Sequence, residues 1–217
     1  CLHHPHTITL RVEFDWRDAP DATAKGMCVS FYSLETGGRY RFDFNNTIGG
    51  EIQLRVGKYR AICHNNDTEA MLFYNAEDFE TYGTYTRQSN VLEPIYGNGA
   101  NYAPKSEGTE DERAVLTTDM MWGCCAFDIE VTDTGVEYIC VPYSQYASRT
   151  APRISMQDHT IILYPHELTC IYTYEVRNVK NLKHMTQMCG TLSGMSGMLT
   201  FFNEKLDEEC VTLPFES

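Results

Sequence analysis

The residues best suited to chemistry in this sequence are its cysteines, and the first of them opens the chain. Cys1 stands where cleavage of a lipoprotein signal would leave the cysteine that is then diacylated. Diacylation followed by N-acylation supplies the two or three hydrocarbon chains that stable membrane anchoring requires. Cys1 is therefore the candidate lipidation site, and the alternative is that a cysteine stands first by chance.

The other eight cysteines carry no recognisable metal or redox motif. No C-x-x-C pair occurs, and two adjacent cysteines suit neither a zinc knuckle nor a thioredoxin motif. An even number of cysteines in an exported protein allows disulfides, whereas a reduced cysteine inside a strand packs as a small hydrophobic residue. Both states stay open for Cys28, Cys63, Cys124, Cys125, Cys140, Cys170, Cys189 and Cys210.

Two further patterns share only part of a catalytic or metal-binding motif. The run Gly194–Met198 matches the first glycine and the serine of the nucleophile elbow G-x-S-x-G, but its last residue is methionine and no strand-to-helix context follows. His3, His4 and His6 are close enough along the chain to share a metal ion, but no carboxylate accompanies them at a fixed spacing. The sequence therefore predicts no catalytic residue, no cofactor and no metal site.

Tyrosines offer a different kind of site. Tyr82, Tyr85, Tyr96 and Tyr102 lie in or beside a polar stretch of the chain, where exposed rings could stack on sugars. This pattern supports an alternative function, a surface module that binds a glycan or a host protein through the loops between residues 82 and 102.

Composition narrows the classes of function. The 217 residues carry 17 basic and 30 acidic side chains, a formal net charge of −13, which repels phosphate backbones and disfavours nucleic-acid binding. No apolar run approaches the roughly 18 residues of a membrane-spanning helix. The hydrophobic content of 42% excludes a disordered chain. These numbers indicate an acidic globular protein.

Alternation of apolar and polar residues dominates the first part of the chain. This period of two is typical of strands that bury one face, and short strands separated by glycine-rich turns indicate a β-sandwich. The five expected strands span residues 8–16, 27–32, 40–44, 52–56 and 59–63. The core side chains expected from them are Ile8, Leu10, Val12, Phe14, Trp16, Val29, Phe31, Tyr40, Phe42, Leu54 and Tyr59.

The remaining chain predicts a second all-β half. A capping residue and early acids predict one short helix within Asp67–Tyr82, and the polar residues 97–113 predict a long loop or linker. The expected division is an N-terminal β-sandwich over residues 1–112, with the helix and the polar loop, and a C-terminal β-sandwich over residues 113–217. Strands of the second half are expected at residues 127–131, 136–140, 161–164, 169–179 and 211–215.

Motifs spread over nearly the whole chain resemble a known family. The most distinctive are the F-D-W-R block that begins at Phe14 and the N-N-D-T-E block that begins at Asn65. Together the motifs resemble a family of Bacteroidales envelope lipoproteins related to the fimbrillin-like proteins, which include anchor and minor subunits of type V fimbriae. The matching segments are Val12–Trp16, Ala19–Ala22, Gly26–Met27, Gly57–Arg60, Asn65–Glu69, Arg177–Leu182 and Leu192–Gly197.

This resemblance implies two tandem antiparallel β-sandwiches of the transthyretin-like, fimbrillin-like type, the second incomplete because family members are usually longer. It also implies a lipid anchor, a location in the cell envelope as an outer-membrane lipoprotein or at the cell surface, and no enzymatic activity. Type V subunits polymerise by strand exchange, so other fimbrial subunits are the implied partners. We expect a non-catalytic structural or adhesive protein resembling a fimbrial anchor or accessory subunit.

Overall fold

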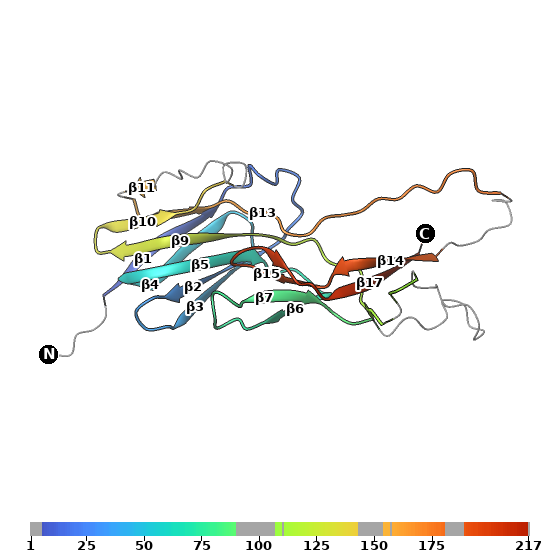
Figure 1. Cartoon of the computed structure of the whole chain (residues 1–217). Helices are drawn as coiled ribbons and strands as arrows, with labels where there is room; N and C mark the ends of the chain where they lie inside the picture. Colours follow the sequence, from blue (N-terminus) through green and yellow to red (C-terminus); the bar gives the residue numbers. More distant parts are fainter. Residues whose placement is uncertain are drawn as a thin grey trace.

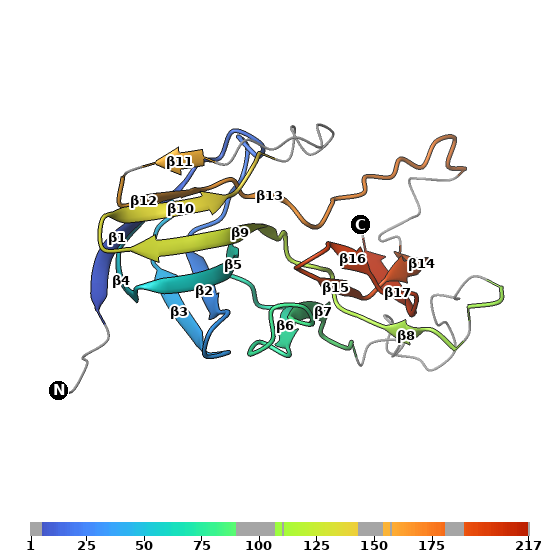
Figure 2. The ribbon, with the colours of Figure 1, turned by 60° about the vertical axis from the view of Figure 1, so that its left-hand side comes forward.

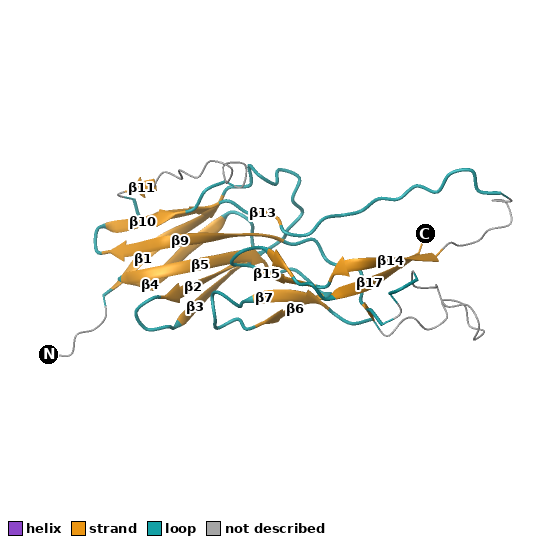
Figure 3. Cartoon of the chain, viewed as in Figure 1, coloured by secondary structure: helices purple, strands orange, loops and turns teal. Residues whose placement is uncertain are grey.

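The chain is built of strands. The computed structural model describes residues 6–89, 107–109, 111–142, 154–156, 158–180 and 189–216, and within these ranges every regular element is a strand (Figures 1 and 3). The expected all-β class is therefore confirmed. The strands are β1 (Thr7–Phe14), β2 (Met27–Ser33), β3 (Arg39–Phe44), β4 (Gly49–Arg55), β5 (Gly57–Asn65), β6 (Met71–Tyr74), β7 (Gly83–Thr86), β8 (Arg113–Ala114), β9 (Trp122–Thr132), β10 (Gly135–Ile139), β11 (Ile154–Met156), β12 (Thr160–Leu163), β13 (His166–Glu167), β14 (Cys189–Ser196), β15 (Met198–Thr200), β16 (Lys205–Leu206) and β17 (Cys210–Glu216).

The described strands form four sheets. A three-stranded sheet has the order β12-β1-β4, and a seven-stranded sheet has the order β11-β10-β9-β5-β2-β3 with β13 also paired to β9. Two smaller sheets have the orders β14-β17-β8 and β16-β15-β7-β6. In Figures 1 and 2 the first two sheets make up one end of the molecule, and β14 and β17 lie toward the other end.

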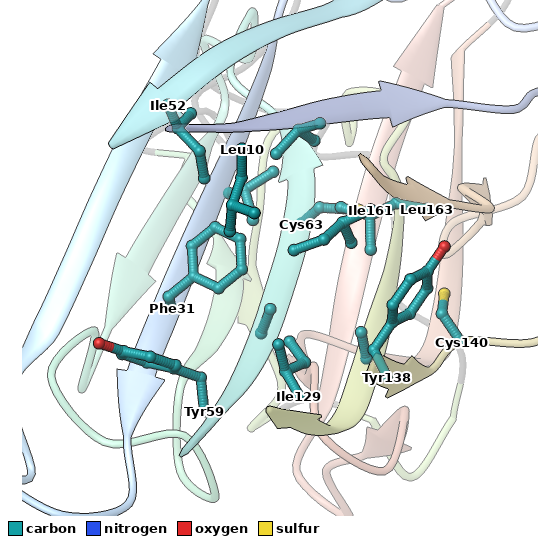
Figure 4. Packing of buried hydrophobic residues seen from close by; sticks show 14 of the residues in the cluster. Leu10, Phe31, Ile52, Tyr59, Cys63, Ile129, Tyr138, Cys140, Ile161 and Leu163 are labelled. Atoms are coloured by element: carbon teal, nitrogen blue, oxygen red, sulfur yellow. The ribbon is translucent and has the colours of Figure 1, made fainter. Parts of the chain in front are cut away.

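The three-stranded and seven-stranded sheets enclose the larger hydrophobic core. Leu10 and Ile161 on one side meet Phe31 and Ile129 on the other (Figure 4). Fully burying one such side chain stabilises the fold by roughly 1.5–3 kcal/mol. The expected core is confirmed: Leu10, Val12, Phe14, Val29, Phe31, Leu54 and Tyr59 are buried, and Ile8, Trp16, Tyr40 and Phe42 pack against the same core while partly exposed.

Two strand pairs differ from the antiparallel arrangement that the sequence suggested. β1 and β12 run parallel, with Val12 opposite Ile161, and β17 and β8 also run parallel. Parallel neighbours need a long connection, and here more than a hundred residues separate β1 from β12. The expectation of purely antiparallel sheets is therefore wrong at these two pairs.

The seven-stranded sheet is covered on its other face as well. There Ile62 of β5 and Cys125 of β9 pack with Tyr82, Met121 and Phe201 in a second core, against the sheet that contains β7 and β15. As a result β2 buries all seven of its residues. The molecule thus has three layers of sheet at this level, with the seven-stranded sheet in the middle.

The short helix expected within Asp67–Tyr82 is wrong. Met71–Tyr74 forms β6, which pairs with β7, because a run of Met, Leu, Phe and Tyr suits a pleated surface. The acids act in turns instead: the Asp78 carboxylate accepts hydrogen bonds from the backbone N–H groups of Glu80 and Thr81 at 2.8 and 3.2 Å.

The expected boundary between residues 112 and 113 does not coincide with a boundary between sheets. β9 pairs with β5 along most of its length, from Gly57 opposite Val131 to His64 opposite Gly123. β12 pairs with β1, and β15 pairs with β7. The first sandwich therefore takes strands from both halves of the sequence, and a second tandem sandwich stays a prediction.

Candidate functional site

The most concentrated group of reactive side chains lies in the second core and was missed by the sequence analysis. Cys28 and His64 stand opposite each other on β2 and β5, with the Cys28 Sγ atom 3.3 Å from His64 Nε2. His64 Nδ1 lies 2.8 Å from the carbonyl oxygen of Asn65, and Nε2 lies 2.8 Å from the Tyr82 hydroxyl. The His64 ring also stacks against the rings of Phe73 and Phe201, at centroid distances of 4.7 and 5.0 Å.

Burial removes the chemistry that a cysteine and a histidine could otherwise share. Desolvation raises the pKa of Cys28 to about 12 and lowers the pKa of His64 to about 4. A carbonyl can only accept, so His64 Nδ1 donates to Asn65 and neutral Nε2 accepts from Tyr82. A thiolate nucleophile needs a lowered pKa and access to substrate, whereas Cys28 and His64 are 0% and 1% exposed. This group holds the core together and does not form a catalytic dyad.

Of the candidate metal ligands and nucleophiles singled out from the sequence, His6 and Ser196 lie within the described residues. Cys1, His3 and His4 lie outside the described residues, and His6 is exposed, with Nδ1 3.7 Å from an Asp133 carboxylate oxygen. Ser196 ends β14, and its hydroxyl donates to the carbonyl oxygen of Met198 at 3.0 Å.

The tyrosines proposed for sugar binding do not form an exposed platform where they are described. Tyr82 is 0% exposed and belongs to the second core, so its assignment to a surface site is wrong. Tyr85 in β7 is half-buried, and Tyr96 and Tyr102 lie outside the described residues.

The main accessible feature is an extended segment, Cys170–Lys180, which leaves the body of the molecule after β13 (Figure 1). It contains four large apolar or aromatic side chains that are more than half exposed: Ile171 at 73%, Tyr172 at 64%, Tyr174 at 52% and Val176 at 53%. The strand expected at residues 169–179 is wrong in this structure, because within the described residues this segment pairs with no strand.

The segment contacts the sheet of β14, β17 and β8 through an aromatic pair. The rings of Tyr174 and Phe215 in β17 have a centroid distance of 4.5 Å. The Glu112 carboxylate ties this sheet together, since it accepts hydrogen bonds from the Gly194 N–H at 3.0 Å and from the Thr212 hydroxyl at 2.8 Å. A β-prone segment with exposed apolar side chains, beside a sheet of three strands, is typical of a surface that pairs with another strand.

Residues 1–216 match the family described as "Domain of unknown function (DUF5119)". The chain belongs to the DUF5119 family. Among the described residues of this DUF5119 chain, no helix has the length and apolar character needed to cross a bilayer.

Individual relatives of the DUF5119 chain come from Bacteroides. A protein of Bacteroides ovatus named "Putative fimbrium anchoring subunit Fim4B" is 30% identical over 81 residues, which are 37% of this chain and 24% of that protein. A solved structure from Bacteroides ovatus described as a "putative adhesin" covers 94% of this chain and 60% of its own, with a TM-score of 0.59 and 16% identity. That likeness shows a shared fold. The DUF5119 chain spans less than two thirds of the length of either relative.

Proposed function

We propose that this chain is a non-catalytic structural or adhesive protein of the bacterial cell envelope, which serves as an anchor or accessory subunit of a fimbrium. Its relative named as a fimbrium anchoring subunit supports this role, and so does a fold shared with a protein described as an adhesin. The burial of Cys28 and His64 keeps the thiol and the imidazole neutral, which argues against an enzymatic use of this pair.

The observation that carries the proposal is the extended segment Cys170–Lys180. Its exposed residues Ile171, Tyr172, Tyr174 and Val176 have the β-branched and aromatic side chains that strands favour. In β-augmentation a partner's backbone pairs with such a segment, and pockets on the partner accept alternate side chains. The occupant that we propose is a strand-binding groove of another fimbrial subunit. Burial of these side chains at the contact would remove a surface that is costly to leave in water.

The cellular test is deletion of the gene in the bacterium that encodes this chain, followed by electron microscopy of the cells and of the medium. The proposed role predicts that fimbriae are lost from the cells or released into the medium, and that the wild-type gene restores them. A complementing gene with Tyr172→Asp and Val176→Asp should fail although the protein is present. Exposed Asp158→Asn is a matched control and should restore attachment. Fimbriae of unchanged number and attachment in the deletion strain would contradict the proposal.

Anchoring in the membrane is proposed to depend on Cys1. The fatty acids attached there would hold the subunit in the outer membrane, since two or more acyl chains give stable binding. Mass spectrometry of the N-terminal peptide of the protein isolated from cells should show a diacylglycerol thioether on Cys1. An unmodified Cys1 in that peptide would contradict this anchor.

The alternative function, a module for glycans or host proteins, has less support. Of the tyrosines that suggested it, Tyr82 is in the core and Tyr85 is half-buried. Specific binding on a glycan array by the wild-type protein would favour this alternative.

A further inference from the structure

The buried thiols of the seven-stranded sheet have an arrangement that the proposed function does not use. Cys63 in β5 and Cys124 in β9 stand directly opposite each other in an antiparallel pair. Both side chains point into the larger core, where they are 1% and 4% exposed, and their Sγ atoms are 3.3 Å apart.

This geometry is close to that of a cross-strand disulfide. Directly opposite residues of antiparallel strands have Cα atoms about 4.5–5.5 Å apart, which lies within the range of about 4.4–6.8 Å that disulfides span. The Sγ atoms need to approach by only about 1.3 Å to reach a bond of about 2.05 Å. Rotation of two short side chains can supply that movement, so the backbone pairing of β5 and β9 can stay as it is.

We propose that Cys63 and Cys124 form a dithiol that closes to a cross-strand disulfide when the chain folds in the presence of a small-molecule or protein disulfide. One thiolate attacks the oxidant to give a mixed disulfide and releases one thiol of the oxidant. The other cysteine then attacks the mixed disulfide and releases the second thiol. The two cysteines lose two electrons and two protons, and the oxidant gains both.

Burial determines when the bond forms. Desolvation raises the pKa of the Cys124 thiol well above its ordinary value, so the folded, reduced protein holds very little thiolate at this position. Oxidation is therefore fast while β5 and β9 are coming together and slow once the core has closed. For the same reason a disulfide in this position is shielded from external reductants.

Two neighbouring cysteines, Cys140 and Cys125, could compete for a place in this disulfide. Cys140 also interacts with Cys124 and belongs to the same core (Figure 4), but it follows β10, whose pairing with β9 shifts register between Glu137 and Ile139. Cys125 points to the opposite face of β9, where its thiol donates to the carbonyl oxygen of Phe201 at 3.4 Å. Direct opposition in the strand register favours Cys63 as the partner of Cys124, and Cys125 is a matched control.

The test is to refold the wild-type protein in a mixture of reduced and oxidised glutathione, block the remaining thiols with N-ethylmaleimide in denaturant, and map the peptides by mass spectrometry. Trypsin leaves Cys63 as the sole cysteine between Arg60 and Arg87, and cleavage at Asp128 or Glu130 separates Cys124 from Cys140. The proposal predicts a bridge from the Cys63 peptide that persists in Cys125→Ala and disappears in Cys124→Ala. The oxidised wild-type protein should also lose on the order of 5–10 °C of Tm on full reduction.

Three results would overturn the proposal: complete labelling of Cys63 after oxidative refolding, a bridge between Cys124 and Cys140, or a Cys63 bridge that is lost in Cys125→Ala. Fragment ions that separate Cys124 from Cys125 in the bridged wild-type peptide give the same assignment, so the test remains decisive if a variant fails to fold. The inference is independent of the adhesive role, which neither outcome changes.

Discussion

At the residue scale, the buried polar side chains at the end of β5 connect neighbouring segments of the chain. Asn65 is 1% exposed, and its side chain accepts from the Trp122 N–H at 2.9 Å and donates to Asp67 and to the Met120 carbonyl. His64 satisfies both ring nitrogens in the same region. A buried polar group with its partners costs little, whereas one without them is strongly destabilising. These contacts connect β5 to β9 and to the chain that leads into β9.

The stability of the fold should depend on pH through His64. Its pKa in the folded protein is about 4, below the ordinary value of 6.5, chiefly because burial disfavours the charged ring. Below pH 6.5 the unfolded chain therefore gains a proton that the folded chain does not, and the free energy of unfolding falls until about pH 4. Between pH 6.5 and 5 this loss should be about 1.5 kcal/mol.

Urea denaturation of wild-type and His64→Gln proteins at several pH values measures this effect. In the His64→Gln protein, the free energy of unfolding should fall less between pH 6.5 and 5 than in the wild type. Replacement of the exposed His159 by Gln is the control and should leave the wild-type dependence on pH unchanged. Parallel profiles for the wild-type and His64→Gln proteins would show that His64 is not kept neutral by burial.

The residue types alone indicated the apolar core but not the buried hydrogen bonds of His64 and Asn65. Alternation placed Leu10 and Phe31 correctly, because period two reports which face of a strand is buried. His64 lies in the alternating run of β5 and carries no motif, and its partner Cys28 is far away in sequence. Only strand pairing brings them together.

At the element scale, the strands of the first sandwich were predictable and their partners were not. Each strand is recognised from a pattern of neighbouring residues, whereas β1 pairs in parallel with β12, which lies more than a hundred residues later in the sequence. β2 shows the limit most clearly. Its alternation of apolar and smaller or more polar residues predicts one solvent-exposed face, yet both faces are buried. The sign in the sequence that both faces are buried is that β2 contains no charged residue.

The approach of β5 to β9 should depend on Gly123. A Cβ atom at Gly123 would collide with the Cys63 carbonyl oxygen and meet Leu168 Cδ1 at 2.9 Å. Gly123→Ala should therefore lower the free energy of unfolding by about 1–3 kcal/mol, as overpacking does in a close-packed interior.

Thermal denaturation followed by circular dichroism measures this cost. Gly38→Ala is the control, since its Cβ would meet nothing nearer than Thr36 Oγ1 at 3.3 Å, and it should stay within about 0.5 kcal/mol of wild type. An equally small effect of Gly123→Ala would show that β5 and β9 are farther apart at this point.

At the scale of the whole molecule, the layers around the seven-stranded sheet are closely packed, whereas the Cys170–Lys180 segment exposes apolar side chains. The three layers around the seven-stranded sheet bury their apolar faces in two cores. The sheet of β14, β17 and β8 has half-buried or exposed residues such as Leu213 and Phe215, and the Cys170–Lys180 segment beside it is exposed. The sequence correctly indicated β-prone residues there. It could not show that Cys170–Lys180 pairs with no strand within the described residues. Strand pairing depends on segments distant in sequence or on other chains, and a local pattern of residues carries no information about them.

The central claim is that Cys170–Lys180 pairs with a strand of a partner subunit, and hydrogen exchange measures this directly. Amide exchange should be followed by mass spectrometry in the isolated protein and after mixing with fimbrial subunits purified from the same bacterium. Unpaired backbone exchanges fast and strand pairing protects it. The account predicts fast exchange at Ile171–Val176 in the isolated protein and protection in the mixture. A stable complex in which these amides still exchange fast would contradict it, as would full protection in the isolated chain.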